Sequence, residues 1–298
     1  MFDFRLKVFY TVAQHLNFTK ASKELLISQP AVTKHIKEIE KLLSIRVFKR
    51  ENNHIYLTEA GKILYKKSKK IFSLYNELEY EIGTIREQYS GKLSIGASST
   101  IAQWVIPEVL SKFKKAYPTI EISLMNANSE NIEKALQNNK IDIGIVEGSH
   151  IKKELKYSFF KDDILLPVVS SNNNLSKIKN ISLKELPNMP LVLREEGSGT
   201  LEVILKTLYS KKEITLSDLN VVMHLGSTEG IKTYLQHSDT MAIVSCCAVQ
   251  NEIESGTLKQ LHIRDVKFKR TFRFVTCKET PSGLVNKFMS FAKHNYNL

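Results

Sequence analysis

The sequence has few cysteines and no long apolar stretch. Two of its three cysteines are adjacent and the third stands alone, which suits neither a disulfide framework nor a zinc site. We therefore expect reduced, buried thiols at Cys246, Cys247 and Cys277, with a redox switch as the alternative, and no metal site. No run of about 18 apolar residues occurs, so no membrane-spanning helix and no membrane partner are expected. The chain opens without a signal-peptide pattern, which predicts a cytoplasmic protein.

Motifs of nucleotide-dependent and metal-dependent enzymes are also missing. Residues 197–199 read Gly-Ser-Gly, but Glu202 stands where a dinucleotide fingerprint needs its third glycine. Neither a Walker A motif nor a His-Glu-x-x-His pattern occurs, and the eight histidines are scattered. A Cys246 nucleophile with His224 or His237 is an alternative that no motif supports. The sequence thus predicts no catalytic residue, no cofactor and no enzymatic activity.

Positive charge, in contrast, is abundant and unevenly distributed. The formal net charge is +12, and residues 1–70 contain fifteen Lys and Arg against six Asp and Glu, which is nine of those twelve charges. Such a basic balance indicates a polyanionic partner or an anionic membrane surface. The basic function is therefore expected in the N-terminal segment.

The first 45 residues or so show the periodicity of three helices. Apolar residues recur at helical spacing over residues 4–16, and a short second helix is expected over residues 20–25. A third helix has the clearest start signal, because Ser28 can cap it and Pro30 fits its first turn. The apolar stripe of the third helix, expected to be buried, consists of Val32, Ile36, Ile39 and Leu43.

The opposite stripe of the third helix carries hydrogen-bonding, methyl-bearing and cationic side chains near its N-terminal end. This is the end that a recognition helix inserts into the major groove. Residues 47–50 and 54–57 predict two strands around the turn 51–53, a wing with basic residues placed for phosphates. The alternative is a helical domain with a solvated basic face. The residues of the polar stripe are Gln29, Ala31, Thr33, Lys34 and Lys37.

These motifs closely resemble the N-terminal signature of LysR-type transcriptional regulators, in the right order over about sixty residues. The matching runs are residues 9–13 (FYTVA), 17–22 (NFTKAS), 27–33 (ISQPAVT), 36–40 (IKEIE) and 57–61 (LTEAG). The resemblance implies a winged helix-turn-helix. Residues 52–54 are Asn-Asn-His, where the family often has further arginines, so the wing is expected to bind the DNA backbone less strongly. The side chains that it places near bases or phosphates are Gln29, Pro30, Ala31, Thr33, Lys34, Lys37 and Arg50.

A long linker helix is predicted to follow the wing. Thr58 can cap a helix over residues 59–88, which would span about 45 Å. Its apolar residues repeat at the spacing of a coiled-coil seam: Leu64, Ile71, Leu74, Leu78, Ile82 and Ile85. A lone helix would expose this seam, so we expect pairing with a second copy, a homodimer that presents two recognition helices to DNA. Packing within one chain is the alternative, and a homotetramer is implied by the family alone.

Beyond residue 90 short apolar strands alternate with helices, which predicts an α/β fold with ligands at the carboxyl ends of parallel strands. The resemblance implies a two-lobed effector domain similar to the type 2 periplasmic binding proteins, with a cleft under two crossover strands. The expected domains are a winged helix-turn-helix (1–58), a linker helix (59–89) and an effector-binding domain (90–298), with lobe I at 90–162 and 267–298 and lobe II at 163–266.

Three polar clusters fall where that topology puts the cleft: residues 98–100, 194–200 and 226–229. Each stands at a strand-to-helix turn, where hydroxyls and free backbone N–H groups can face an anion. One such cluster alone would be explained as a helix cap. Glu147 would also border the cleft and could hold the ammonium group of an amino-acid-like effector. The candidate effector ligands are Ser98, Ser99, Thr100, Glu147, Ser198, Thr200, Ser227 and Thr228.

The resemblance implies a transcriptional regulator that binds double-stranded DNA under the control of a small effector, with RNA polymerase as a further partner. Within the family, the polar clusters resemble the regulators of sulfur assimilation and of carbon fixation, which points to a small anion or a short carboxylate. A solute-binding protein would explain residues 92–298 alone. A structural nucleoid protein would explain the basic segment alone, and sequence-specific binding separates it from a regulator.

Overall fold

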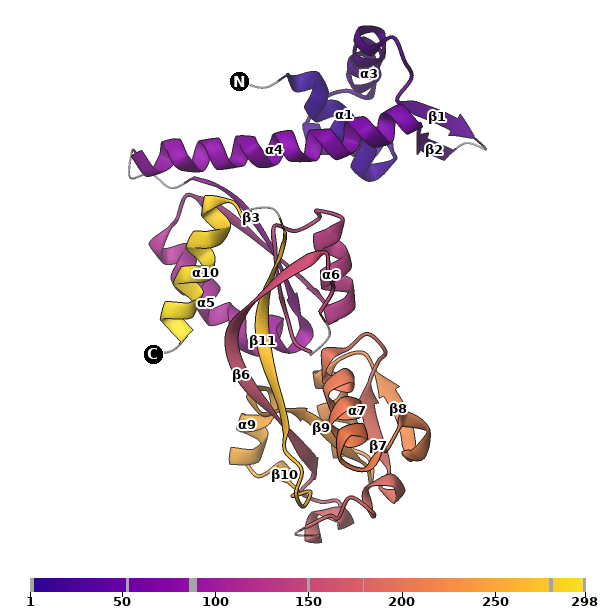
Figure 1. Ribbon diagram of the computed structural model, residues 1–298, viewed down its shortest axis with the longest axis vertical. Helices are drawn as coiled ribbons and strands as arrows, with labels where there is room; N and C mark the ends of the chain where they lie inside the picture. The colour runs from indigo at the N-terminus through magenta and orange to yellow at the C-terminus, as the bar shows by residue number, and fades with distance from the viewer. Residues whose placement is uncertain are drawn as a thin grey trace. The chain divides into compact units, whose positions relative to one another are not determined.

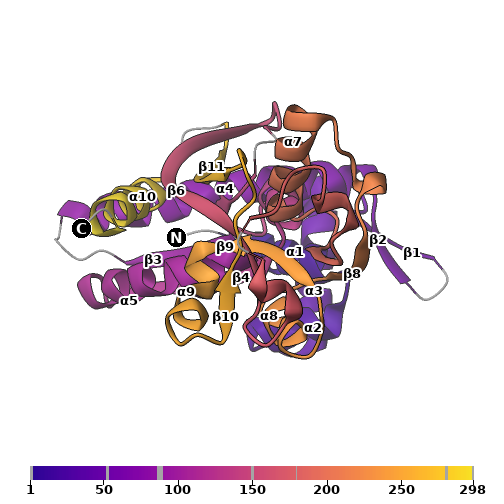
Figure 2. The same cartoon turned by 90° about the horizontal axis from the view of Figure 1, so that it is seen from below.

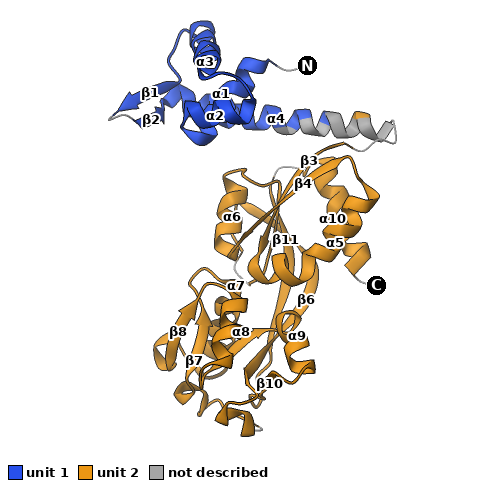
Figure 3. Cartoon of the chain, turned by 180° about the vertical axis from the view of Figure 1, so that it is seen from behind, with its two compact units in different colours: residues 1–79 blue, residues 80–298 orange. Residues whose placement is uncertain are grey.

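The computed structural model describes residues 3–51, 54–85, 90–148, 151–178, 180–278 and 281–296. The chain forms two compact units, residues 1–79 and residues 80–298, which Figure 3 colours separately. The division falls within the long helix α4 (Glu59–Ile85). Among the residues that the structure describes, no helix is both long and apolar enough to cross a lipid bilayer.

The first unit is a winged helix-turn-helix, as predicted. Its elements before α4 are α1 (Phe4–His15), α2 (Phe18–Leu25), α3 (Gln29–Leu43) and the antiparallel hairpin of β1 (Phe48–Glu51) with β2 (His54–Leu57) (Figure 1). The predicted cap of α3 is confirmed, because Ser28 Oγ accepts the backbone N–H of Ala31 at 3.3 Å. Helix α2 starts earlier than predicted, since the side chain of Asn17 caps it by accepting the N–H of Lys20 at 2.9 Å. The tip of the wing, residues 52 and 53, lies outside the described residues.

The core of this unit forms where the apolar stripe of α3 meets α1 and α2. Val32, Ile36 and Ile39 are buried there, as predicted. Leu43 is 48% exposed, so its predicted burial was wrong. The helix ends at Leu43, Ser44 adopts a left-handed conformation with φ of 51°, and the chain enters the core again only at Val47.

Helix α4 follows the wing, and its predicted cap is also confirmed: Thr58 Oγ1 accepts the backbone N–H of Gly61 at 3.0 Å. The described part has 27 residues, about 40 Å of helix, and the predicted end at Gln88 lies outside the described residues. Leu64 packs against the core of the first unit, so it does not belong to the exposed seam. Ile85 has no described side chain. The remaining seam residues are 38–63% exposed: Ile71, Leu74, Leu78 and Ile82.

The second unit has two lobes, as predicted. Lobe I contains the parallel strands β3 (Gly91–Ser98), β4 (Ile120–Ala127) and β5 (Ile143–Val146), with the π-helix η1 (Ile101–Val105) and helices α5 (Ile106–Ala116), α6 (Ser129–Gln137) and α10 (Gly283–Tyr296). Helices α5 and α10 pack together through Phe113 and Phe288, whose ring centroids are 5.3 Å apart. The apolar core of lobe I lies between these two helices and the sheet.

Lobe II repeats the strand-helix alternation. It contains β7 (Leu191–Arg194), β8 (Val221–Leu225), β9 (Met241–Ser245) and β10 (Leu258–Gln260), with helices α7 (Gly199–Lys212), α8 (Thr228–Gln236) and α9 (Cys246–Glu254). Three short 3-10 helices complete it: Asn174–Lys177, Leu186–Asn188 and Leu216–Asp218. Strand β7 runs parallel to both β8 and β9, so the carboxyl ends of these strands and the starts of α7, α8 and α9 gather at one edge.

Two long strands connect the lobes, β6 (Leu155–Ser170) and β11 (Phe268–Cys277). They pair antiparallel along ten residue positions and join both lobes into one sheet of nine strands, in the order β4-β3-β5-β11-β6-β9-β7-β8 with β10 on β6. Figures 1 and 2 show these crossover strands from two directions. The short apolar stretches 165–169 and 272–276 are only parts of β6 and β11, because the remainder of each strand is too polar to be recognised as a buried strand.

Candidate functional site

The exposed face of α3 carries most of the predicted DNA contacts. Gln29, Pro30, Lys34 and Lys37 are exposed, and Thr33 is half-buried with its hydroxyl donating to the carbonyl of Gln29 at 3.1 Å. These five residues, with Glu38 and Lys41, line one shallow depression on the helix surface. Ala31 is half-buried and does not line it. The face therefore combines cations with hydrogen-bonding groups, the set that reads base edges and phosphates.

Arg50, the predicted phosphate contact of the wing, lies on β1 and is exposed. Its guanidinium carbon is 5.7 Å from the centre of the Phe18 ring, a distance typical of a cation–π contact. This contact restrains the side chain while the guanidinium stays accessible. The structure thus places Arg50 on a different element from the cations of α3.

Replacing Lys34 by alanine is expected to weaken binding to a specific DNA site by about 10- to 100-fold, because one good contact to a base or phosphate is worth about 1–3 kcal/mol. Fluorescence anisotropy with labelled DNA measures the effect. Lys153→Ala removes an equally charged, exposed side chain of the effector domain and should leave the affinity unchanged. Equal affinity of both variants for DNA would contradict the assignment of α3 as the recognition helix.

In the effector domain, the carboxylate of Glu147 lies at the junction of the two lobes and is buried. Ser98, at the end of β3, donates its hydroxyl to Glu147 Oε2 at 3.0 Å. Thr200, on α7 of the opposite lobe, donates to Oε1 at 3.1 Å, and Thr100 lies 3.5 Å from the same oxygen. Arg270 on β11 completes the group, with Nη1 3.1 Å from Oε1. Glu147 therefore already has a cationic partner within the chain.

Arg270 joins this carboxylate to a second one on the crossover strands. Its Nε donates to Asp163 Oδ2 at 2.6 Å, and both side chains are fully buried. Nη1 also donates to the Thr200 hydroxyl at 2.8 Å. The hydroxyl of Ser245 donates to Asp163 from the end of β9. One guanidinium is thus shared by two buried carboxylates, and the hydroxyl donors lower the cost of burying the extra negative charge.

A second buried arginine, Arg194, ends β7 and is 1% exposed. It pairs with the partly exposed Glu195, at 2.8 Å between Nε and Oε2. Its Nη2 reaches across to the Ser99 hydroxyl of lobe I at 3.4 Å, and its Nη1 donates to the Thr228 hydroxyl at 3.3 Å. Both of these hydroxyls stand at the start of helical segments, where backbone N–H groups add positive potential.

The eight predicted effector ligands therefore fall into three groups. Ser98, Thr100, Glu147 and Thr200 meet around Arg270, whereas Ser99 and Thr228 contact Arg194. The remaining two cap helices: Ser198 Oγ accepts the N–H of Thr200 at 3.2 Å, and Ser227 Oγ accepts the N–H of Gly230 at 3.0 Å.

Sequence reasoning missed both arginines and Asp163 as members of the site. Arg194 stands inside the second polar cluster, and a single buried cation after an apolar strand was the signal that could have found it. Arg270 and Asp163 are separated by 107 positions and belong to segments without a turn signal. Only the pairing of β6 with β11 brings them together.

A cavity of about 430 Å³ opens beside Glu147, between α6 and the start of α7. Five glutamates and one lysine are among its lining residues: Glu130, Glu133, Glu147, Glu196, Glu202 and Lys152. Glu133 is paired with Lys152, at 3.0 Å. The excess of carboxylates makes this cavity unfavourable for an anion.

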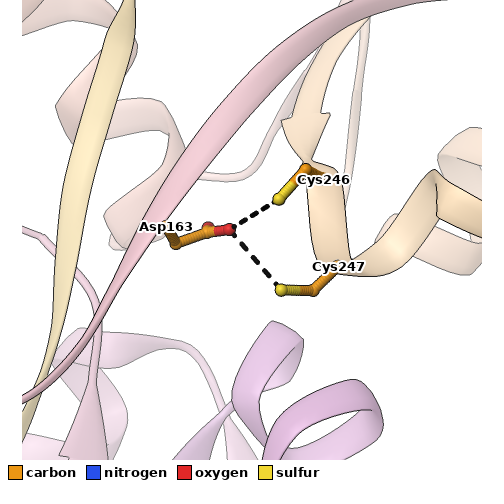
Figure 4. A group of neighbouring side chains, drawn as sticks. All are labelled: Asp163, Cys246 and Cys247. Atoms are coloured by element: carbon orange, nitrogen blue, oxygen red, sulfur yellow. Dashed lines mark hydrogen bonds between the residues drawn. The ribbon is translucent and has the colours of Figure 1, made fainter. Parts of the chain in front are cut away.

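Cys246 and Cys247 are free and lie at the start of α9, facing Asp163 (Figure 4). Both are half-buried, so the expected full burial was wrong, because the helix start leaves them at the edge of the core. Hydrogen bonding with Cys247 lowers the pKa of the Cys246 thiol to about 7. The same hydrogen bond, together with burial, raises the pKa of Cys247. Cys277, on β11, is also half-buried.

Comparison with known families and proteins agrees with this architecture. Residues 4–62 match the family described as bacterial regulatory helix-turn-helix protein, lysR family, and residues 86–297 match the LysR substrate binding domain. The chain is 30% identical over 293 residues to the HTH-type transcriptional regulator CysL of Bacillus subtilis, covering 98% of this chain and 96% of CysL. It is also 30% identical over 289 residues to a probable RuBisCO transcriptional regulator of Phaeodactylum tricornutum, covering 96% and 94%.

Among solved structures, the regulatory domain of Synechocystis CcmR, in complex with 2-PG, superposes with a TM-score of 0.62 at 26% identity. The superposition covers 70% of this chain and 98% of that domain. The family predicted from the sequence, and its branch of sulfur-assimilation and carbon-fixation regulators, are confirmed by these relatives.

Proposed function

Because this chain belongs to the LysR family of bacterial transcriptional regulators, we propose that a small anion, held between the lobes of its effector domain, controls its binding to specific DNA sites. The chain is a DNA-binding regulator with an effector domain and not an enzyme. The proposal concerns the class of effector, the residues that bind it and the oligomeric state.

The observation that carries the proposal is the position of Arg194. Its guanidinium is buried, and it reaches hydroxyls of both lobes through bonds of 3.3–3.4 Å, which are long for hydrogen bonds. An oxyanion or carboxylate at this point exchanges these long contacts for charge-assisted ones with Arg194, Ser99 and Thr228. The N-terminal end of α8 supplies further N–H groups.

A positively charged effector group is disfavoured at Glu147, the other candidate position for the effector. Glu147, which was considered for an ammonium group, is paired with Arg270 and accepts hydroxyls from both lobes. An amino-acid-like effector would have to displace that arginine. A purely anionic effector at Arg194 leaves the buried Glu147–Arg270 pair intact and competes only with Glu195, whose carboxylate is partly exposed and can turn towards solvent. This difference favours the anion over the zwitterion.

The effector acts in this proposal by stabilising one arrangement of the lobes. An anion bridging Ser99 of lobe I and Arg194 of lobe II binds best when the lobes are close, and it shifts the equilibrium by its difference in affinity for the two states. Two copies pair along the exposed apolar residues of α4, and the lobe arrangement alters the spacing of their recognition helices. We further propose a homotetramer, contact with RNA polymerase at promoters, and action in the cytoplasm, where the chromosomal DNA is.

A thermal-shift screen tests the effector class. The purified protein is mixed with sulfate, thiosulfate, phosphate, citrate and 2-PG, and with cysteine and O-acetylserine for the zwitterionic class. A ligand at about 100 times its dissociation constant should stabilise the domain by about 2.7 kcal/mol. Arg194→Gln is expected to abolish the shift, whereas Arg264→Gln, an exposed arginine of the same lobe, should retain it. A shift that survives Arg194→Gln, or that only the amino acids produce, would refute the anion site.

A further inference from the structure

Strand β9 leads directly into α9, and this connection places two adjacent thiols beside a buried carboxylate. Cys246 Sγ is 3.4 Å and Cys247 Sγ is 3.7 Å from the same atom, Asp163 Oδ1. Figure 4 shows both side chains directed at this oxygen. Together they offer three ligand atoms, all within 4.8 Å of one another. The regulator's proposed anion contacts use none of these three side chains.

We propose that Asp163, Cys246 and Cys247 form a binding site for a thiophilic divalent cation such as Zn²⁺. Zinc bonds of about 2.3 Å to sulfur and about 2.0 Å to oxygen place these atoms about 3.5 Å apart at the edges of a tetrahedron. The two sulfur–oxygen distances, 3.4 and 3.7 Å, fit that edge. Among divalent cations, a sulfur-rich ligand set favours zinc or cadmium over magnesium or calcium.

The surroundings hold the carboxylate in the orientation that a metal ion requires. Arg270 Nε donates to Oδ2, on the side of the carboxylate away from the atom that both sulfurs approach. Ser245 donates to the same carboxylate from the residue before Cys246. Residues that hydrogen-bond to a metal-binding side chain fix its orientation, and their removal lowers the affinity for the metal about 10- to 100-fold. Oδ1 is thereby turned towards the sulfurs.

Charge and access are also compatible with a bound ion. A divalent cation that replaces the two thiol protons leaves the net charge of the site unchanged, because both sulfurs bind as thiolates. Arg270 continues to offset the second buried carboxylate, Glu147. Both cysteines are half-buried and not enclosed, so an ion can enter, and a fourth coordination position is left for water or a thiol.

Titration with Cd²⁺ tests the site in the full-length protein, reduced with a phosphine and stripped of metal. Cadmium bound by thiolates absorbs in the ultraviolet, and we expect this band to saturate at one ion per chain. Cys246→Ser and Cys247→Ser should each weaken binding at least about 100-fold, since each removes a direct ligand. Cys277→Ser, the third cysteine of the chain, is the matched control and should bind as the parent does. Circular dichroism checks that each variant is folded.

X-ray absorption at the zinc edge of the unmutated protein gives a second measurement that does not depend on the stability of a variant. We expect two sulfur neighbours at about 2.3 Å, with oxygen or nitrogen at about 2.0 Å. No saturating cadmium band, a band retained in both Cys246→Ser and Cys247→Ser, or a zinc shell without sulfur would each overturn the proposal.

Discussion

Arg270→Met is expected to lower the free energy of unfolding of the effector domain by about 3–5 kcal/mol, because it leaves buried carboxylates without their cation. The guanidinium of Arg270 contacts both Glu147 and Asp163, and all three side chains are at most 2% exposed. Methionine keeps much of the side-chain volume, so the loss reports on charge and hydrogen bonding and not on a cavity.

Urea denaturation followed by circular dichroism measures this effect. Lys269→Met provides the control, because it removes an exposed cation from the neighbouring position of β11 and should change stability by less than about 0.5 kcal/mol. A loss of under 1 kcal/mol in Arg270→Met would mean that the two carboxylates find other partners or take up protons, and that the arginine is not the centre of the lobe junction.

Leu74→Lys combined with Leu78→Lys is expected to weaken binding to a two-half-site operator by about 10²- to 10⁴-fold, by converting a bivalent interaction into a monovalent one. The two leucines are 63% and 40% exposed along α4, in a row that the first unit does not cover. Lysines at these positions place like charges opposite one another in a paired helix. Binding to an isolated half-site should be nearly unchanged, because the recognition helix is untouched.

Sedimentation analysis and fluorescence anisotropy test this prediction together. Lys66→Gln, an exposed position of α4 outside the apolar repeat, is the control and should leave both the assembly and the operator affinity unchanged. If the double variant sediments with the same mass as the parent protein, the proposed pairing through α4 is wrong.

The sequence was sufficient for elements whose signals are local. Ser28 and Pro30 marked the start of α3, and Thr58 marked the start of α4, because a cap depends on residues within one turn of the helix. Burial at Leu43 was misjudged, because periodicity alone does not show where a helix leaves the core. The polar clusters at the ends of β3 and β7 were identified for the same local reason.

The centre of the effector site depends instead on pairing between distant segments. Arg270 and Asp163 lie on β11 and β6, and each stands in a short run of charged residues, 269–270 and 161–163, within an otherwise largely uncharged strand. Such a pattern gives no indication of which partner strand a charge will face. The cysteine pair is similar: its spacing along the chain gives no metal motif, and Asp163, the third ligand of the proposed site, comes from a strand 83 positions before Cys246.

The antiparallel pairing of β6 and β11 also limits how the lobes can move. Sliding one strand along the other would break the register that links Phe268 to Leu165 and Cys277 to Leu155, whereas bending of both strands together preserves it. The register shift between Phe272 and Arg273 is the point at which a two-stranded ribbon bends and twists most easily. The two lobes should therefore move apart by bending of β6 and β11 at this irregularity. Arg270 lies two residues before Phe272, so its side chain should change orientation as the angle between the lobes changes.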